Sequence, residues 1–505
     1  MSVLLVDHTD LYQKQIALEL LKLKLPISAI VSDRVNYFDN KNLPPKIKIF
    51  NIYDFYYADR IRQLSTQNTI SKKALSSDDI KQFFELESQF LKISDRLAFT
   101  AISVHQRLEL YYQLLLFWLN FFKENGIKLI IFAQTPHTGF DNIIFFIACQ
   151  YQIKTIIVSP TSIGTNCLLI EDYRQCRQIP ANFKNNRSKT ELISLINPRL
   201  YAQAYGEGSW QRTGQNINAK VLTNNQNNVV LRSLKRVVST LHSQPIQTFR
   251  HLFRRSRNSI FVFNRPLQNW QELLLTASFY LKRKSLITDY ERLTTEVDDS
   301  RKFVFFALHY QPERTTMPEG GVFEDQFLAL NILSNSLPKD WIIYVKEHPR
   351  EFSLNDVRTK HFRDSKYYSR LLKIPQVRLV PIKQNSQELI KKSQFTASIQ
   401  GTVGWESLQQ HKPTMVFANS WYGACSSSYQ VSSVDECQNA VKAIKNSTSA
   451  DVELDVLRFL VYIQDQLVEA SFYHQQAISS DVPYEQQLKN LAIALNNFYD
   501  QNCTK

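Results

Sequence analysis

The sequence is poor in the residues and runs that mark zinc-binding, secreted and membrane-spanning proteins. Its six cysteines form no C-x-x-C pair and have no histidine at a zinc-ligand spacing, which argues against a zinc site and a disulfide framework. The most apolar stretch, Leu114 to Phe122, is far shorter than the roughly 20 residues that a membrane-spanning helix needs. Residues 2–6 read as a buried strand without a basic leader, so we expect no secretory signal and a cytoplasmic protein.

Three motifs of nucleotide chemistry are also missing. There is no G-x-x-x-x-G-K-[ST] loop, which argues against a phosphate-cleaving NTPase, and no G-x-G-x-x-G after the first strand, which argues against a dinucleotide oxidoreductase. Without a D-x-D triplet, nothing supports a metal ion that clamps phosphates. We therefore predict no metal site and no cofactor.

Positive charge is what the sequence has in excess, with a formal net charge of +14 and a pI near 9.3. Nucleic acid, an anionic membrane and an anionic substrate would all fit this charge. Residues 229–265 contain eight arginines and lysines and no acidic residue, and the apolar residues between them would let this stretch lie on the anionic inner face of the cytoplasmic membrane; the alternative is a solvated linker helix. No aromatic stacking platform accompanies the charge, so we expect no nucleic-acid partner.

A chain of 505 residues is too long for one ordinary core, and its pattern predicts two domains. Residues 1–228 alternate short apolar strands with helical patterns, which predicts an N-terminal Rossmann-like domain. Residues 229–300 form the predicted basic helical connector, and residues 301–450 form a second Rossmann-like domain. Residues 451–505 have a helical period, and we expect them to pack back across both domains.

The second domain has the clearer pattern. Helical segments separate its strands, which is typical of a doubly wound parallel sheet. The predicted strands are Phe303 to Leu308, Trp341 to Lys346, Val377 to Val380, Phe395 to Ile399 and Thr414 to Ala418. In such a sheet a ligand lies outside the carboxyl ends of the strands, so the residues that follow each strand are the candidates for a site.

Polar residues follow three of these strands. The loop after the first strand contains Gln311 and Glu313, which offer hydrogen-bond donors and acceptors on either side of Pro312. The second strand ends at Lys346 and is followed by His348, a pair suited to phosphate oxygens, although a lone histidine before proline is more often structural.

The remaining loop is a turn that opens a helix. Ser398, Gly401 and Thr402 bring backbone N–H groups and hydroxyls to a helix N-terminus, which is a ready site for an anion. Glu406 is expected in the first turn of this helix. There its carboxylate either accepts hydrogen bonds from the hydroxyls of a ribose or simply interacts favourably with the helix dipole. Together the three loops predict a site for the phosphate of a nucleotide at one edge of the sheet.

The sequence resembles the bacterial capsule polysaccharide biosynthesis family over residues 309–422. The resemblance rests on HYQPERTTMPEGGVFEDQ, YVKEHP and SIQGTVGWESLQQHKPTMVFANSWY, in which Gln311-Pro312 and His348-Pro349 match the family's Gln-Pro and His-Pro motifs. It implies a GT-B glycosyltransferase of the α/β class, with two Rossmann-like domains facing a cleft, additional helices and a C-terminal helical segment. The second domain would hold the nucleotide sugar and the first the acceptor.

The donor follows from the same resemblance. The family includes transferases of 3-deoxy-manno-octulosonic acid (Kdo), which implies transfer of Kdo or a related acidic sugar from a CMP-linked donor to a growing surface polysaccharide or glycolipid. After Trp421-Tyr422 the sequence departs from the Kdo type, because Gly423 to Ser428 replaces a Trp-Gly-rich continuation. Two alternatives stay open: a CDP-polyol phosphotransferase of the teichoic-acid type, and a non-catalytic polysaccharide-assembly protein.

The general base is expected in the first domain, where PHTGFD, residues 136–141, looks like the family's loop after a strand. Asp141 and His137 are the favoured candidates, and Asp7 and His8 after the first strand are held in reserve. Asp141 has an alternative role as the cap of a helix that begins at Asn142.

Overall fold

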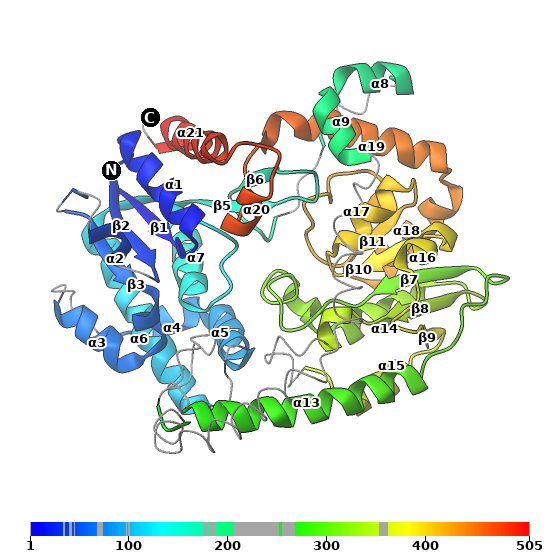
Figure 1. Ribbon diagram of the computed structural model, residues 1–505, viewed down its shortest axis with the longest axis horizontal. Helices are drawn as coiled ribbons and strands as arrows, with labels where there is room; N and C mark the ends of the chain where they lie inside the picture. Colours follow the sequence, from blue (N-terminus) through cyan, green and yellow to red (C-terminus); the bar gives the residue numbers. More distant parts are fainter. Residues whose placement is uncertain are drawn as a thin grey trace, which may run out of the picture. The chain divides into compact units, whose positions relative to one another are not determined.

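The computed structural model describes residues 2–33, 36–39, 43, 44, 46–67, 74–96, 98, 102–175, 179, 180, 187–205, 252–254, 268–352 and 362–503. The chain forms two compact units, which are described separately. Unit 1 contains Met1–Gln175 and Tyr462–Lys505, and unit 2 contains Cys176–Val461. In Figure 1 the sheet of unit 1 is blue to cyan with its last helix in red, and the sheet of unit 2 is green to yellow.

Unit 1 is built on a seven-stranded sheet with the order β13-β6-β5-β4-β1-β2-β3. The five strands from β5 to β3 are parallel, whereas β6 is antiparallel to β5 and β13 is antiparallel to β6. The strands are β1 (Ser2–Val6), β2 (Ile27–Ser32), β3 (Lys48–Asn51), β4 (Ile127–Phe132), β5 (Lys154–Pro160), β6 (Cys167–Ile170) and β13 (Leu467–Val468).

Helices of unit 1 begin and end at residues that can cap them. Asp10 opens α1 by accepting from the backbone N–H of Tyr12 at 2.8 Å, and Gly126 ends α6 with a φ of 55°, which a residue without Cβ adopts freely. Leu20 of α1 and Leu491 of α21 share one core with β1, so the C-terminal helix covers this sheet. The helices are α1 (Leu11–Lys22), α2 (Asn36–Asp39), α3 (Ala58–Gln67), α4 (Ser77–Gln82), α5 (Phe84–Arg96), α6 (Val104–Asn125), α7 (Phe140–Gln150), α20 (His474–Ile478) and α21 (Tyr484–Cys503).

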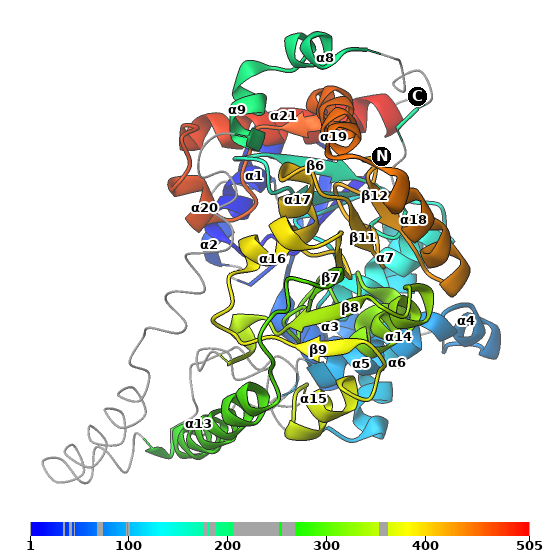
Figure 2. The same cartoon turned by 90° about the vertical axis from the view of Figure 1, so that its right-hand side faces the viewer.

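Unit 2 is built on a six-stranded parallel sheet with the order β12-β11-β10-β7-β8-β9. Val304 and Phe306 of β7 point into one core and Phe303 and Phe305 into another, so the sheet is buried on both faces. Figure 2 shows β7, β8 and β9 side by side. The strands are β7 (Phe303–Ala307), β8 (Ile342–Lys346), β9 (Val377–Leu379), β10 (Thr396–Ser398), β11 (Thr414–Val416) and β12 (Ser428–Gln430).

Helices of unit 2 connect and cover these strands. α14 and α18 pack against each other, and Leu330 and Val441 from the two helices lie in the same core as β7. The helices are α8 (Lys189–Leu195), α9 (Pro198–Tyr205), α13 (Asn269–Arg292), α14 (Gln326–Ser336), α15 (Ser365–Leu371), α16 (Ser386–Lys392), α17 (Thr402–Gln409), α18 (Val434–Asn446) and α19 (Ser449–Ile463).

The predicted fold class, α/β with two Rossmann-like domains and additional helices, is confirmed. The first segment of unit 1 ends at Gln175. The predicted limit at residue 228 lies outside the described residues, as does nearly all of the basic stretch 229–265 with its predicted membrane contact. The C-terminal segment divides, because α19 belongs almost wholly to unit 2 and α21 to unit 1. Over the described part of the chain, no helix combines the length and the apolar character that crossing a membrane requires.

Candidate functional site

The three polar loops predicted from the sequence lie at one edge of the sheet of unit 2. They follow β7, β8 and β10, and β7 pairs with both of the other strands. The loops also touch directly, because the backbone N–H of Gln400 donates to Nε2 of His309 at 3.2 Å and the Gln400 amide donates to the carbonyl of Thr315 at 2.8 Å. The carboxyl ends of adjacent parallel strands therefore form one continuous polar surface.

His309 links the loop after β7 to the loop after β10. Gln326 fixes its backbone from both sides, accepting from the N–H at 2.7 Å and donating to the carbonyl at 3.0 Å. Burial lowers the pKa of His309 to about 4, and the positive charge of Arg363 lowers it further. The ring is therefore neutral at physiological pH and accepts from Gln400 without adding charge.

Gln311 faces the protein interior with both ends of its amide. Its Nε2 donates to the carbonyl of Glu324 at 2.8 Å, and its Oε1 accepts from Nη1 of Arg363 at 2.6 Å. Its backbone N–H donates to Oε2 of Glu351 at 3.1 Å. Gln311 therefore anchors the loop after β7 in this structure, and its predicted contact with the donor stays a prediction.

Beneath these loops lies a buried ion pair that the sequence did not reveal. Nε of Arg363 donates to Oε2 of Glu347 at 2.8 Å, with both side chains fully buried, and the hydroxyl of Tyr368 donates to the same oxygen at 2.9 Å. Glu347 stands inside the quoted motif YVKEHP, but nothing local marks Arg363 as its partner. The pair joins the loop after β8 to the loop after β7 through Gln311.

Glu313, the second residue predicted in the loop after β7, is also turned toward its own loop. Its carboxylate accepts from the hydroxyl of Thr315 at 2.8 Å, and burial raises its pKa while that hydrogen bond and the nearby charge of Arg314 lower it. Arg314 in turn pairs with Glu319 at 3.0 Å. The charges of this loop therefore compensate one another.

Lys346 is buried at the end of β8. Its Nζ donates to the carbonyl of Gln384 at 2.6 Å and to the hydroxyl of Ser386 at 2.9 Å, which uses two of its three N–H donors. Burial lowers the pKa of Lys346 to about 8, opposed by the negative charge of Glu406. One N–H donor remains for a ligand at this edge.

His348 is neutral, which changes its predicted part in phosphate binding. Burial, reinforced by the neighbouring basic groups such as Arg350 and Lys346, lowers the pKa of His348 to about 3. Its Nδ1 accepts from the backbone N–H of Arg350 at 3.1 Å, which assigns the proton to Nε2. The ring can therefore donate one hydrogen bond to a phosphate but cannot supply a positive charge.

Arg350 supplies the exposed charge that His348 lacks. It lies in the 3₁₀ helix Pro349–Phe352, and its guanidinium carbon is 5.7 Å from the centre of the Tyr310 ring. A guanidinium can bind two phosphate oxygens at once. Arg350 was not among the predicted site residues, although it directly follows the His-Pro motif.

The turn after β10 opens α17 as predicted. α17 begins at Thr402 with Gly401 as its N-cap, and the N–H of Gly401 donates to Oγ of Ser398 at 3.0 Å. Thr402 is exposed at this N-terminus. The hydroxyl of Ser398 is thus used inside the turn. The hydroxyl of Thr402 donates weakly to Glu406 at 3.5 Å and is exposed at the surface.

Glu406 lies in the second turn of α17, and the prediction that it stands in the first turn was wrong, because the helix begins at Thr402 instead of Gly404. Its carboxylate accepts from the amide of Gln387 at 2.7 Å, and burial raises its pKa. With 6% of its surface exposed, Glu406 mainly faces α16 and Lys346.

Gly404 is required by a close contact inside the turn. A Cβ at this position would lie 2.2 Å from the hydroxyl oxygen of Tyr422, which donates to the carbonyl of Gly401 at 2.5 Å. We expect Gly404→Ala to displace the ring and lower the stability by about 1–3 kcal/mol, the usual effect of overpacking. Thermal unfolding should show this loss for Gly404→Ala but not for Thr402→Ala on the same helix. Unchanged stability would contradict the contact.

In unit 1, the candidates for the base meet at the carboxyl ends of two adjacent strands. Asp7 and His8 follow β1, and the loop with His137 and Asp141 follows β4, which pairs with β1. Burial lowers the pKa of His8 to about 4, and its Nδ1 lies 3.2 Å from the carbonyl of Val6. His8 is therefore a neutral buried ring.

Asp141 organises the loop before α7. Its Oδ1 accepts from the backbone N–H groups of Thr138 and Asn142, and its Oδ2 accepts from the N–H of His137, each at 2.8 Å. α7 begins at Phe140 with Gly139 as N-cap and not at Asn142 as predicted, so Asp141 lies inside the first turn instead of at the N-cap. Its role as catalytic base stays a prediction.

Asp7 has the properties of a proton acceptor. Its φ of 63° places it in the left-handed region, and its Oδ2 accepts from the amide of Gln134. Burial, reinforced by the negative charge of Asp141, raises the pKa of Asp7 to about 7. A carboxylate that titrates near neutral pH can both take up and release a proton.

One group of side chains in unit 1 could hold a metal ion. Ligand atoms of Asp7, His137 and Asp141 lie within 4.8 Å of one another. Asp141 already accepts three N–H groups, and Nδ1 of His137 lies 2.8 Å from the carbonyl of Thr135. The sequence motifs did not reveal this group, because Asp7 lies more than 100 residues before His137 and Asp141 in the sequence.

Residues 314–473 match the family model described as "Capsule polysaccharide biosynthesis protein". The family predicted from the motifs is thereby confirmed for this part of the chain. No curated protein sequence matches the chain.

Solved structures resemble the chain only distantly. KpsC of Thermosulfurimonas dismutans, a β-Kdo 2,7 transferase, aligns at 10% identity over 78% of this chain and 91% of its own, with a TM-score of 0.29. The UDP-GlcNAc 2-epimerase of Methanocaldococcus jannaschii in complex with UDP-GlcNAc and UDP aligns at 12% identity over 92% of this chain and 100% of its own, with a TM-score of 0.26. These values are too low to transfer either activity to this protein.

Proposed function

Because residues 314–473 belong to the capsule polysaccharide biosynthesis family, we propose that the protein is a glycosyltransferase that extends a bacterial surface polysaccharide or glycolipid. The observation that carries the proposal is the joining of three polar loops at the carboxyl edge of the sheet of unit 2, within and next to the matched residues. The donor is a nucleotide sugar, and we favour a CMP-linked Kdo or a related acidic sugar, because the motifs around Gln311 and His348 resemble those of Kdo transferases.

Unit 2 binds the donor phosphate in this proposal. Arg350 supplies the charge, Nε2–H of His348 and the remaining N–H of Lys346 donate hydrogen bonds, and Thr402 at the N-terminus of α17 adds its hydroxyl. As the bond between the anomeric carbon and the phosphate oxygen breaks, these donors stabilise the electron pair that stays on the departing nucleotide.

Unit 1 accepts the proton. The acceptor hydroxyl forms the new bond to the anomeric carbon, and its proton passes to the carboxylate of Asp7. Asp7 is favoured over Asp141, because Asp141 already accepts three backbone N–H groups and Asp7 has a pKa of about 7. His137 and Asp141 would then shape the loop beside it.

A donor panel tests the proposed function. The purified chain is incubated with CMP-, CDP- and UDP-linked donors and a glycan acceptor, with and without EDTA, and release of each nucleotide is measured. We expect release of CMP from a CMP-linked acidic sugar and no loss of rate in EDTA. Polyol phosphate transfer from a CDP-linked donor would favour the teichoic-acid type. If no donor is consumed or raises the melting temperature, a non-catalytic assembly protein becomes the better interpretation.

Arg350→Ala is expected to raise KM for the donor by about tenfold or more, because a hydrogen bond to a charged group contributes about 1.5–3 kcal/mol. Arg350→Lys should restore part of the affinity, since lysine keeps the charge but loses the two-oxygen contact. Arg292→Ala is the control, because Arg292 is exposed on α13 and pairs only with Asp289 among the described residues. Equal KM values for Arg350→Ala and the control would remove Arg350 from the site.

A further inference from the structure

A cavity of about 510 Å³ lies at the other edge of the sheet of unit 2, where the strands begin. Lys302 immediately precedes β7, Trp341 precedes β8 and Lys412-Pro413 precedes β11. The end of α18 with Lys445 and the start of α19 complete the wall. The candidate donor site follows the carboxyl ends of β7, β8 and β10 in the same parallel sheet, so the two sites lie at opposite edges of the sheet.

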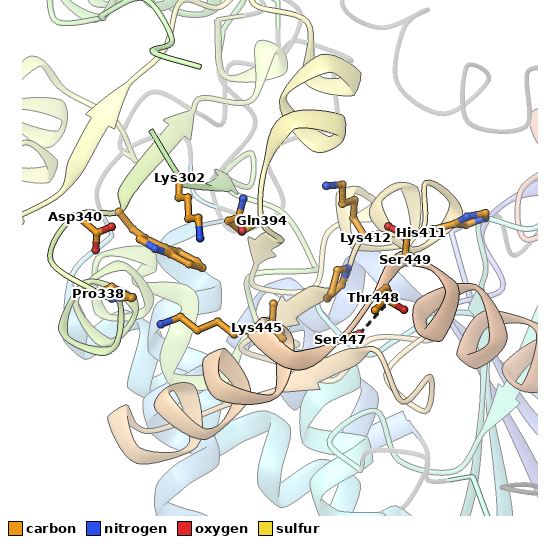
Figure 3. Close-up of a pocket in the computed structure, with 13 residues that line it drawn as sticks. Lys302, Pro338, Asp340, Gln394, His411, Lys412, Lys445, Ser447, Thr448 and Ser449 are labelled. Atoms are coloured by element: carbon orange, nitrogen blue, oxygen red, sulfur yellow. Dashed lines mark hydrogen bonds between the residues drawn. The ribbon is translucent and has the colours of Figure 1, made fainter. Parts of the chain in front are cut away.

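Positive charge dominates the lining of this cavity. Figure 3 shows Lys302 and Lys445 on the side with Pro338 and Asp340, and Lys412 with His411 on the side with Ser447–Ser449. Asp340 is the one carboxylate among the described residues that line the cavity. Three lysines and a single carboxylate therefore contribute to the lining of this cavity.

The lysines have few neighbours that neutralise them. Lys412 donates to the carbonyl of Ser393 at 3.1 Å, and Lys445 lies 5.5 Å from the centre of the Trp341 ring. In the described residues none of the three lysines forms an ion pair with a carboxylate. Half-buried Lys412 has a pKa lowered by burial, which shows that its charge is poorly solvated. An anion in the cavity would stabilise all three charges.

Hydroxyl groups and a helix terminus also lie at this wall, where the hydroxyl of Ser447 donates to the carbonyl of Thr448 at 3.5 Å and that of Thr448 donates to Asp451 at 2.7 Å. Ser447, Thr448 and Ser449 lie where α19 begins, and the positive end of this helix dipole is directed at the same region. Asp451 in the first turn opposes part of this effect, because its carboxylate accepts from the N–H and the hydroxyl of Thr448. The lysines are therefore the main source of attraction.

We propose that this cavity is a second anion-binding site, which holds a phosphate group carried either by a small soluble molecule or by a lipid headgroup. Several ammonium groups beside hydroxyls match a phosphate, which accepts hydrogen bonds on three oxygens. The volume falls within the range of roughly 300–1,000 Å³ of cavities that bind small molecules. The site is separate from the proposed donor edge, so its occupancy does not depend on the proposed reaction.

The matched pair of double variants is Lys302→Gln with Lys445→Gln, and Lys391→Gln with Lys442→Gln. All four lysines are exposed, and both pairs remove the same charge, but only the first pair lines the cavity. Circular dichroism and thermal unfolding of the full chain serve as the control that both double variants fold.

Binding is measured by calorimetry with pyrophosphate at constant ionic strength, in an Arg350→Ala background that weakens the donor edge. We expect the cavity pair to lose affinity by about tenfold or more while the control pair keeps it. Vesicles of phosphatidylglycerol provide the second arm, in which retention during sedimentation should be lost by the cavity pair alone.

If the cavity pair alone loses affinity for pyrophosphate, the ligand is a soluble phosphate. If the cavity pair alone loses binding to vesicles and keeps its affinity for pyrophosphate, the ligand is a lipid headgroup. Each result supports the anion site. Equal binding by the two pairs in both arms, or no binding by the parent chain in either, overturns it. Donor turnover is recorded separately, so a failure of this site and a failure of the proposed reaction are distinguishable.

Discussion

Asp7→Asn is expected to lower turnover by about 10²- to 10⁴-fold, the usual contribution of a general base. Asparagine keeps the size of the side chain, can still accept from Gln134, and tolerates the left-handed backbone at φ 63°. The loss would therefore come from the missing proton acceptor. Measured rates of nucleotide release with saturating donor test this, and a variant with normal turnover would exclude Asp7 as the base.

The pH profile gives a second measure of the same residue. Since the pKa of Asp7 is raised to about 7, we expect kcat/KM to fall as the pH drops below 7, because the protonated carboxyl cannot accept a proton. This fall should disappear from the residual activity of Asp7→Asn. A profile that stays flat between pH 5 and 8 in the parent enzyme would contradict the assignment.

The contribution of Asp7 to folding stability should fall as the pH rises, whereas its contribution to activity should increase. The folded-state pKa of Asp7 lies above its unfolded value, so the stability it contributes is fully present below pH 3.8 and is lost as the pH rises through about 7. At pH 8 the parent buries a carboxylate, and Asp7→Asn should unfold at an equal or higher temperature. Asp141→Asn is the contrasting variant, because it weakens contacts with three backbone N–H groups and should unfold at a lower temperature.

Arg363→Met is expected to destabilise unit 2 by about 3–5 kcal/mol, because it leaves the buried carboxylate of Glu347 without its partner. For a unit of this size that loss lowers the melting temperature by on the order of 10 °C. Differential scanning calorimetry of the full chain measures the shift. The amide of Gln311 also loses its donor, so the loop after β7 should loosen and donor affinity should fall in the folded fraction.

Two controls separate this ion pair from ordinary charge effects. Adding Glu347→Gln to Arg363→Met removes the unpaired charge and should recover part of the stability, whereas Glu347→Gln alone leaves Arg363 buried and unpaired. Asp299→Ala breaks the exposed pair with Lys392 and should change stability by less than about 1 kcal/mol. Equal losses for the buried and the exposed pair would show that burial is not the cause.

The strands and the polar loops were predictable from the sequence because they depend on near neighbours. Apolar runs such as Phe303 to Leu308 become β7, and the residues after β7, β8 and β10 meet because parallel strands end at one edge. The predicted start of α17 at Gly404 was two residues too late. The N-cap, Gly401, has no side chain that could mark the start of the helix in the sequence.

Roles within the site depended on groups that are distant in the sequence. Gln311 was predicted to face a ligand, but Arg363, 52 residues later, holds its amide in the structure. The pKa of Asp7 is raised by burial and by Asp141, which approaches it only because β4 pairs with β1. The cavity around Lys302, Lys412 and Lys445 likewise arises where separate strands begin.

By itself, the sequence predicted the fold class, the resemblance of residues 309–422 to the capsule family, and the edge of the sheet that carries the polar loops, because motifs, periodicity and turn residues are local features. Only the tertiary structure decided which side chains are neutral, which are already bonded and which remain open to a ligand. Burial and charge are properties of the three-dimensional neighbourhood, and for Asp7, His348 and Arg350 that neighbourhood is assembled from separate elements.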